Sequence, residues 1–264
     1  MSEAKTAAGF KVVIPARYAS TRLPGKPLAD IGGRPMIERV AERAALAGAD
    51  EVVIATDDQR VADAVSGSGH HVMLTRADHL SGSDRVMEVV ARRGWSDDTR
   101  VINVQGDEPL IPPEVIAQVA DELARAPDVG VATLCEPIAD LAQVFDPNVV
   151  KVVREHGGLA LYFSRAPIPY HRDHFATLDP HPAGPLPATA GWFRHIGIYG
   201  YRVATLRRFV SLPPSPLELA ESLEQLRLLA NGIRIQVAQA LAEVPGGVDT
   251  PADLERVRRL VADG

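Results

Sequence analysis

The chain has 264 residues, 46% of them hydrophobic and 23% charged, which suffices for one full-sized core and makes two wholly independent domains less expected. A net charge of -6 and a pI near 5.8 exclude the basic character typical of nucleic-acid binding, so an anionic ligand requires a local group of Arg and Lys side chains. No signal-peptide pattern opens the sequence and no run approaches the roughly 18 apolar residues of a membrane span, so we expect a cytoplasmic protein without a membrane partner.

The N-terminal half alternates short apolar runs with amphipathic segments. The runs are too short for helices and indicate buried parallel strands, at 10–15, 52–55, 72–74 and 101–104. Between them, apolar residues spaced three and four apart predict helices, near 36–44, 61–65 and 86–90. This alternation predicts an α/β core, a doubly wound and mostly parallel sheet.

The middle of the chain has a different pattern. Pro112 and Pro113 suit the first turn of a helix that continues to about Arg125. Strand-like runs follow at 129–138, 149–154 and 159–163, and a glycine-containing turn joins the last two. These runs predict an inserted antiparallel β unit, in which Cys135, the single cysteine, is expected to be a small core residue.

The remainder of the chain returns to the core. Residues 166–191 are rich in Pro, His and Gly and predict an irregular loop, whereas 194–201 predicts a strand. Residues 216–231 predict one amphipathic helix ended by Gly232, before a strand at 233–239 and a helix from Thr250. We therefore divide the chain into an α/β core, an insertion and a C-terminal return, at 10–128, 129–203 and 204–264.

The richest segment for chemistry is the loop at 15–27, directly after the first strand. Ligands of doubly wound sheets collect at the carboxyl ends of strands, and Arg17, Arg22 and Lys26 can neutralise a triphosphate there. It is not a Walker loop, because the opening glycine is missing and Lys26 precedes Pro27 rather than Ser or Thr, which disfavours an ordinary P-loop kinase or GTPase. The alternative is a solvated basic loop.

Two aspartates are candidates for binding a metal ion. Asp107 follows another core strand and can reach a phosphate-bound Mg²⁺, although Asp beside Gly is also common in turns and caps. Asp249 precedes Thr250, a natural N-cap, and Pro251 at the first helical position. From the residues alone, Asp249 is best interpreted as an ordinary residue before a helix.

An ordered set of motifs extends over about residues 10–260: PARYASTRLPGKP, ATDDQRV, SGSDR, NVQGDEP, YFSRAPIP, RHIGIYGYR, LEQLR and GVDTP. Together they resemble the 3-deoxy-manno-octulosonate cytidylyltransferase (CMP-Kdo synthetase) family, and only the N-terminal tail and the proline-rich loop at 176–190 look unlike it. The resemblance implies a nucleotide-diphospho-sugar transferase fold and transfer of CMP from CTP to 3-deoxy-D-manno-octulosonate (Kdo), releasing pyrophosphate, for lipopolysaccharide synthesis. It also implies a Mg²⁺-dependent, cytoplasmic homodimer, with CTP bound by the core and the sugar site and dimer contact in the insertion.

The resemblance also assigns roles to individual residues, including a metal role for Asp107 and Asp249 that replaces the first interpretation of Asp249. Catalysis is assigned to Arg17, Lys26, Asp107 and Asp249. Nucleotide binding is assigned to Pro15, Ala16, Arg17, Ser20, Arg22, Lys26, Ser81, Gly82, Ser83, Gln105 and Asp107. Sugar binding is assigned to Arg85, Gln105, His195, Tyr199, Glu224 and Gln225.

Alternatives remain open for several of these roles. Arg85 can pair with the carboxylate of Kdo or of another acidic sugar, such as an 8-amino Kdo analogue or sialic acid. His195 and Tyr199 alternate with isoleucines and can also be satisfied residues on the polar face of a strand, and Glu224 can be a solvated helix charge. A noncatalytic nucleotide sensor is the other class of protein considered, and the presence of Lys26 and both aspartates argues against it. No general base is evident, and the remaining histidines lack the spacing of a metal site.

Overall fold

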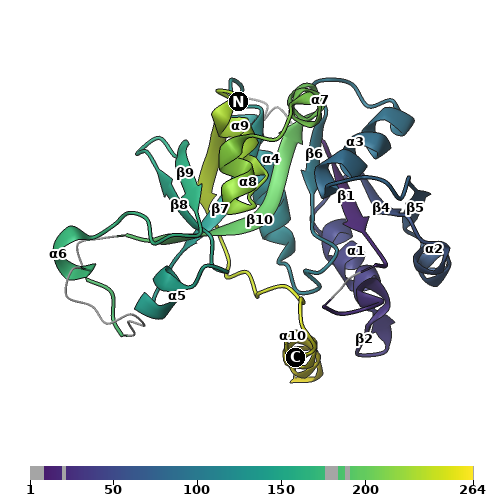
Figure 1. Cartoon of the computed structure of the whole chain (residues 1–264). Coiled ribbons are helices and arrows are strands. Elements are labelled where there is room, and N and C mark those ends of the chain that lie inside the picture. The colour runs from purple at the N-terminus through teal and green to yellow at the C-terminus, as the bar shows by residue number, and fades with distance from the viewer. Residues whose placement is uncertain (1–8, 20–21, 176–183, 188–190, 264) are drawn as a thin grey trace, which may run out of the picture.

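The computed structural model describes residues 9–19, 22–175, 184–187 and 191–263. Among these residues, one nine-stranded sheet organises the molecule, with the order β11-β7-β10-β6-β1-β4-β5 and with β8 pairing β10 and β9 (Figure 1). The strands comprise β1 (Phe10–Ala16), β4 (Glu51–Thr56), β5 (His71–Leu74), β6 (Arg100–Asn103), β7 (Val131–Pro137), β8 (Lys151–Arg154), β9 (Ala160–Ser164), β10 (Phe193–Arg202) and β11 (Ile235–Gln239). A small ribbon of β2 (Asp30–Ile31) and β3 (Arg34–Pro35) lies apart from this sheet.

The N-terminal half has the predicted α/β arrangement. Strand β1 lies between β4 and β6 and is parallel to both, and β5 adds in parallel beside β4. The connecting helices are α1 (Met36–Leu46), α2 (Gln59–Val65), α3 (Gly82–Arg93) and α4 (Pro113–Arg125). Apolar side chains of α1, α2 and α4 pack on one face of the sheet, and those of α3 pack on the other. The doubly wound prediction is therefore confirmed, because both faces of the sheet are covered by helices.

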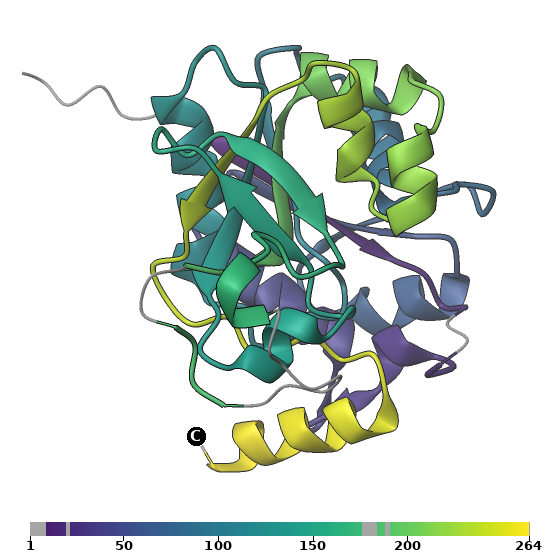
Figure 2. The same ribbon diagram turned by 60° about the vertical axis from the view of Figure 1, so that its left-hand side comes forward.

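Strand β10 joins the predicted insertion to this sheet. It pairs antiparallel with β6, β7 and β8, and β7 also pairs in parallel with β11. The predicted strands at 129–138 and 194–201 are thus members of the central sheet, while the antiparallel hairpin β8–β9 lies outside its main path. Figure 2 shows this hairpin in front of the sheet. Cys135 on β7 is a free, buried thiol, as expected.

The prediction of one helix over 216–231 is wrong. The segment forms α8 (Pro216–Glu221) and α9 (Gln225–Ala230), separated at Ser222, whose φ of 52° is left-handed. The N–H of Leu223 bonds to the carbonyl of Glu218 and closes α8, which lets the Leu223 side chain enter the core. Helical spacing of the apolar residues does not reveal the break, because Leu219, Leu223 and Leu226 keep that spacing across it.

The shorter helices complete the chain. They comprise the 3₁₀ turn η1 (Lys26–Leu28), α5 (Leu141–Phe145), α6 (Arg172–Phe175), α7 (Val203–Ser211) and α10 (Pro251–Asp263). Figures 1 and 2 show α10 at the foot of the molecule, joined to β11 by an extended segment. Within the described ranges, none of the helices combines the length and the apolar character needed to cross a membrane.

Candidate functional site

The predicted phosphate loop opens into a cavity of about 310 Å³ where β1 and β6 end. The cavity brings together the N-terminal loop, the start of α3, the segment after β6 and the segment before α10. Its lining consists of Pro15, Ala16, Arg17, Ala19, Arg22, Lys26, Pro27, Gly82, Gln105, Gly106, Asp107 and Asp249. Most of the predicted nucleotide-binding residues therefore lie around one hollow, and Ser20 lies outside the described residues.

Lys26 joins the two aspartates across this cavity. Its Nζ donates to Asp107 Oδ2 at 2.6 Å and to Asp249 Oδ1 at 3.0 Å, and Arg22 Nη2 lies 3.2 Å from the same Asp249 oxygen. Burial alone would lower the pKa of Lys26, but the two carboxylates raise it above its ordinary value, so the ammonium stays charged. Two carboxylates that lie 249 - 107 = 142 positions apart thus converge on one cation.

This arrangement fits a magnesium ion, since the Lys26 ammonium already takes a cation position between the carboxylates. The residues that the structure describes contain no group of three or more His, Cys, Asp or Glu side chains that could hold a metal. Mg²⁺ commonly uses only one or two protein carboxylates and takes its other ligands from phosphates and water. Asp107 and Asp249 suit a metal ion that arrives with a nucleotide.

The helix cap beside Asp249 does not occupy its carboxylate. Thr250 and Asp253 form a reciprocal cap, in which Thr250 Oγ1 accepts from the Asp253 backbone N–H and donates to Asp253 Oδ2. The Asp249 backbone N–H also donates to Asp253, at 3.2 Å. The side chain of Asp249 is therefore left to face Lys26, which the pre-helix interpretation did not anticipate.

Backbone contacts bring Asp249 to Asp107. The N–H of Val248 donates to the Asp107 carbonyl at 2.8 Å. On the other side of the cavity, Gly106 approaches β1 so closely that a Cβ there would lie 2.8 Å from the Pro15 carbonyl oxygen. Only glycine permits this approach without a shift of the backbone.

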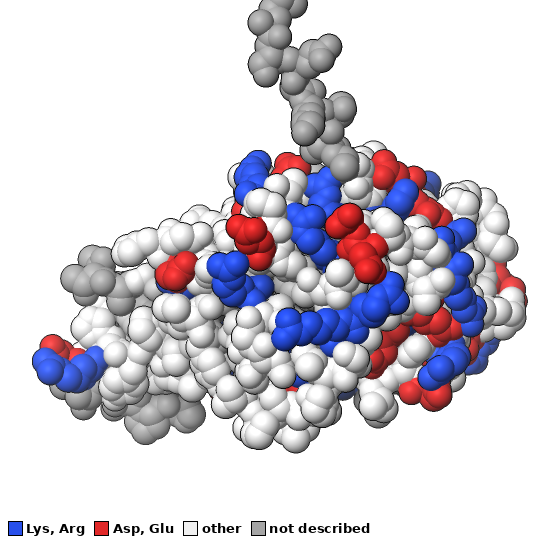
Figure 3. All heavy atoms as spheres, turned by 90° about the horizontal axis from the view of Figure 1, so that it is seen from above, with Lys and Arg blue, Asp and Glu red and all other residues white. Residues whose placement is uncertain are grey.

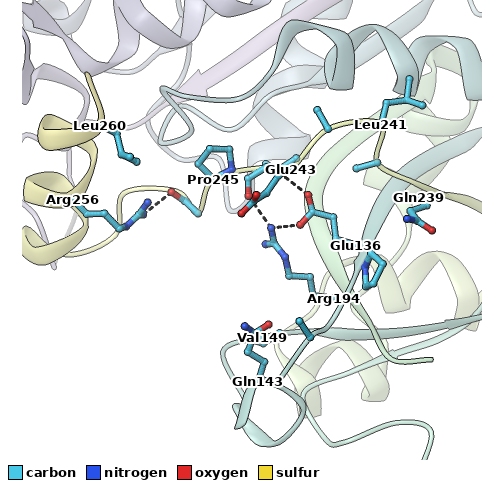
Figure 4. A pocket seen from close by; sticks show the side chains of 16 residues that line it. Glu136, Gln143, Val149, Arg194, Gln239, Leu241, Glu243, Pro245, Arg256 and Leu260 are labelled. Atoms are coloured by element: carbon cyan, nitrogen blue, oxygen red, sulfur yellow. Dashed lines mark hydrogen bonds and ion pairs between the residues drawn. The ribbon is translucent and has the colours of Figure 1, made fainter. Parts of the chain in front are cut away.

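A pair of side chains holds the extended segment that leads to Asp249. Val244 donates its N–H to Glu136 Oε1 at 2.7 Å, and its carbonyl accepts from Arg194 Nη2 at 2.8 Å. Arg194 and Glu136 also form an ion pair, and Figure 4 shows them facing each other beside the segment. The hollow in Figure 4, about 1010 Å³, contains none of the predicted site residues. Sequence reasoning missed both side chains, although Arg194 begins the motif RHIGIYGYR.

The remaining nucleotide-binding candidates border the cavity or support it. Exposed Arg17 donates from Nη2 to the His79 carbonyl and so links the phosphate loop to the segment before α3. Ser81 caps α3 in a capping box with Asp84. Ser83 donates to Glu224 Oε1 at 2.8 Å, so its hydroxyl faces the predicted sugar site.

Gln105 connects the cavity to the predicted sugar-binding residues of β10 and α9. It lines the cavity and donates to the Gly197 carbonyl of β10 at 3.4 Å. Tyr199 is only 5% exposed, and its hydroxyl has no hydrogen-bond partner among the described residues. No described residue satisfies the Tyr199 hydroxyl, and a buried unpaired hydroxyl is costly unless another group pairs with it, so sugar binding by Tyr199 stays a prediction. Gln225, at the start of α9, is buried as well.

Glu224 is not a solvated helix charge, because it is largely buried and accepts from Ser83. Burial raises the pKa of its carboxyl, and the Ser83 hydrogen bond opposes that rise only in part.

Arg85 differs from the other sugar-site candidates. Its side chain is fully buried, with Nη2 2.7 Å from Asp57 Oδ2 and Nη1 2.5 Å from Thr75 Oγ1. Asp57 belongs to the motif ATDDQRV, to which sequence reasoning assigned no role. In this structure Arg85 is paired with a carboxylate of the protein, and its contact with a sugar carboxylate stays a prediction.

Comparisons with known proteins agree with this geometry. A sequence profile of the cytidylyltransferase family matches residues 11–235. The 3-deoxy-manno-octulosonate cytidylyltransferase of Alcanivorax borkumensis is 57% identical over 250 residues, which cover 94% of this chain and 97% of that protein. The protein of the same name from Pseudomonas syringae pv. syringae is 57% identical over 254 residues, 96% of this chain and 98% of that protein. A solved structure of CMP:2-keto-3-deoxy-manno-octonic acid synthetase complexed with CTP has a TM-score of 0.87 and 46% identity, with 97% of this chain and 99% of that chain covered.

Proposed function

The chain belongs to the 3-deoxy-manno-octulosonate cytidylyltransferase family, and on this premise we propose that it transfers CMP from CTP to Kdo and releases pyrophosphate. The product, CMP-Kdo, is an activated sugar for lipopolysaccharide synthesis. The observation that carries the proposal is the convergence of Lys26, Asp107 and Asp249 in one cavity at the carboxyl ends of β1 and β6. That is where a doubly wound sheet places a nucleotide.

The reaction is an in-line displacement at the α-phosphorus of CTP. The anomeric hydroxyl of Kdo gives up its proton to solvent as its oxygen forms the new P–O bond, the bond from the α-phosphorus to the bridging oxygen breaks, and pyrophosphate leaves with that electron pair. Asp107 and Asp249 would hold Mg²⁺, which would supply positive charge at the phosphates. Arg17, Arg22 and Lys26 lie around the same cavity and stabilise the negative charge of the triphosphate.

Nucleotide binding exchanges ion pairs within the site. Without ligand, Lys26 and Arg22 neutralise the aspartates. With a triphosphate bound, Lys26 and Arg22 would pair with the phosphates, and Asp107 and Asp249 would be the residues that hold the accompanying metal ion. The exchange keeps every charge in this partly buried site paired, which limits the cost of desolvation.

The sugar lies beyond Gln105, against β10 and α9. The hydroxyl of Tyr199, which has no partner among the described residues, and the side chain of His195 supply hydrogen bonds to sugar hydroxyls, and Gln105 joins this region to the phosphate cavity. Arg85 releases Asp57 and recognises the sugar carboxylate in its place, or it orients the site through the Arg85–Asp57 pair. Another acidic sugar would place the same demands on these side chains, so it remains the rival substrate.

The protein acts as a cytoplasmic homodimer in this proposal. The segment 129–203 supplies the sugar site and the dimer contact, 10–128 binds CTP, and 204–264 returns Asp249 to the core. Support for the dimer contact comes from exposed apolar side chains on adjoining elements, Leu161 on β9 and Leu219 on α8, which are 61% and 68% exposed. Figure 3 shows that the left part of this view is mostly uncharged apart from a charged group at its far end.

The deciding experiment measures pyrophosphate release with CTP, UTP and ATP, each combined with Kdo, 8-amino Kdo and sialic acid. We expect release with CTP and Kdo and far less with any other pair. The Asp107→Asn, Asp249→Asn double variant, which keeps the size of both side chains, is the control for contaminating activity. CTP binding without release for any sugar would contradict the proposal and favour a nucleotide sensor.

A further inference from the structure

The imidazole of His195 is held by neighbours on three elements. Its ring meets Phe163 of β9 edge-to-face, with centroids 5.0 Å apart, and leans on Tyr199 of β10 at 5.3 Å. Its Nε2 lies 2.9 Å from Oγ1 of Thr133, a fully buried residue of β7. The ring therefore has one defined orientation, and the hydroxyl of Thr133 is its polar partner.

The hydrogen count at Thr133 determines which imidazole nitrogen carries a proton. Oγ1 lies 2.7 Å from the Ile198 carbonyl and 3.1 Å from the Ile196 carbonyl, as well as near His195 Nε2. Carbonyl oxygens only accept, so the single hydroxyl hydrogen points to them, chiefly to Ile198. Nε2 then faces lone pairs of the hydroxyl oxygen, and the contact is attractive only if Nε2 carries a hydrogen and donates it.

The other imidazole nitrogen is then an acceptor. Burial lowers the pKa of His195 to about 3, so the ring is neutral near pH 7 and has one N–H. That N–H is at Nε2, which leaves Nδ1 with a lone pair. Nδ1 makes no hydrogen bond to any residue that the structure describes.

The same hydroxyl stabilises a bulge in β10. From Ile196 to Tyr199 the strand takes three steps while its partner β7 takes one, from Leu134 to Thr133, so β10 has two extra residues there. Thr133 bonds to the carbonyls of this bulge, and the carbonyl of Gly197 within it accepts from Gln105. One side chain of β7 thus supports two of the residues assigned to the sugar site, His195 and Gln105.

We propose that Thr133 is a positioning residue for the sugar site: it fixes His195 as the Nε2–H tautomer and so presents Nδ1 as a hydrogen-bond acceptor for a sugar hydroxyl. This inference deepens the proposed function and rests on it for the identity of the sugar. The role is indirect, because the hydroxyl of Thr133 is used entirely by protein groups. This role concerns only the sugar end of the site, because Thr133 contacts none of the described residues at the phosphate end.

The kinetic test compares Thr133→Val, which keeps the shape but lacks the hydroxyl, with Thr133→Ser, which keeps the hydroxyl. We expect Thr133→Val to raise the KM for Kdo about tenfold and to change the KM for CTP by less than about twofold. Thr133→Ser should restore a KM for Kdo close to that of the unaltered protein. Equal increases in both KM values, or no increase, would overturn the positioning role.

A second measurement needs neither the Thr133 variants nor turnover. Nitrogen NMR of the ¹⁵N-histidine-labelled full chain at pH 7, with the His195 signals assigned by their loss in His195→Gln, should show a protonated Nε2 and an unprotonated Nδ1. The reverse tautomer would overturn the inference even if Thr133→Val failed to fold. If the unaltered chain released no pyrophosphate from CTP and Kdo, the proposed function would fail, whereas the NMR result would still decide the tautomer.

Discussion

At the scale of single residues, Lys26 has two sets of partners available, the carboxylates that it contacts in this structure and the phosphates of a nucleotide. In the structure Lys26 and Arg22 together balance the two carboxylates, and in the proposed function pairing with the phosphates makes Lys26 part of the reaction. Its charge is more useful beside developing negative charge in a partly buried site than it would be in water. This dual role accounts for one lysine lying between two carboxylates that are distant from each other in the sequence.

We expect Lys26→Ala to lower kcat at saturating CTP and Kdo by at least about tenfold, because the variant loses a charge at the transferring phosphate. Lys11→Ala is the matched control, since Lys11 pairs with Asp50 at 3.5 Å, away from the cavity. Turnover of Lys26→Ala equal to that of the control would remove Lys26 from the reaction.

The two aspartates should act as one metal site. Asp107→Asn and Asp249→Asn each keep the shape but lose a charged ligand, so each variant should require more Mg²⁺ for half-maximal turnover and should turn over slowly. Because both side chains contact the same cation, the double variant should be less impaired than the sum of the two free-energy losses. Magnesium titrations of all four proteins measure this. An unchanged titration for Asp249→Asn would return Asp249 to an ordinary residue before a helix.

At the scale of elements, the site depends on how β11 is connected to α10. The connection crosses the molecule in extended form (Figure 1), and Arg194 with Glu136 binds its backbone at Val244 through both the N–H and the carbonyl. The Val248–Asp107 hydrogen bond then sets the last step before Asp249. Strands β7 and β10, which carry Glu136 and Arg194, thereby position Asp249, which lies more than a hundred residues after Glu136 and about fifty-five after Arg194.

We expect Arg194→Lys to raise the Mg²⁺ concentration for half-maximal turnover severalfold, because lysine keeps the charge but cannot bind Glu136 and Val244 with the same planar group. The effect should be smaller than that of Asp249→Asn. Arg207→Lys is the control, as Arg207 forms an exposed pair with Asp97. If both lysine variants had the magnesium titration of the unaltered chain, the pair would only stabilise the fold.

At the scale of the whole molecule, the part that projects from the sheet is the hairpin β8–β9 with its neighbours. Ser164 and Arg165 at the end of β9 bond to Glu221 of α8, so the hairpin and α8 form one continuous surface. Leu161 and Leu219 are exposed on that surface, and the proposed dimer would bury these side chains against a second copy.

Light scattering at micromolar concentration should therefore give twice the chain mass of 28.3 kDa. Leu161→Asp should shift the protein toward the monomer, because it places a charge in the apolar contact. Leu241→Asp should not, since Leu241 is 74% exposed but lines the separate hollow of Figure 4. A mass of 28.3 kDa for the unaltered chain would contradict the dimer.

How far the sequence determines the protein differs between local and distant features. Apolar runs and helical spacing predicted the strands and helices of the α/β core, and the loop after β1 was predicted from its three cations, because these signals lie in neighbouring residues. The break at Ser222 was not predicted, since a left-handed serine leaves no trace in apolar spacing.

The position of Asp249 was decided only by tertiary structure. Read locally, its sequence describes the start of a helix, and the motif resemblance alone suggested a metal role. The fold brings Asp249 to Asp107 because Arg194 and Glu136 bind the backbone of Val244 and the N–H of Val248 donates to the Asp107 carbonyl. The same holds for Thr133 and Arg85, whose partners are distant in sequence. Residue types and local spacing determine which groups are available and which elements form, whereas contacts between distant segments determine which groups meet, because that depends on the packing of the whole sheet.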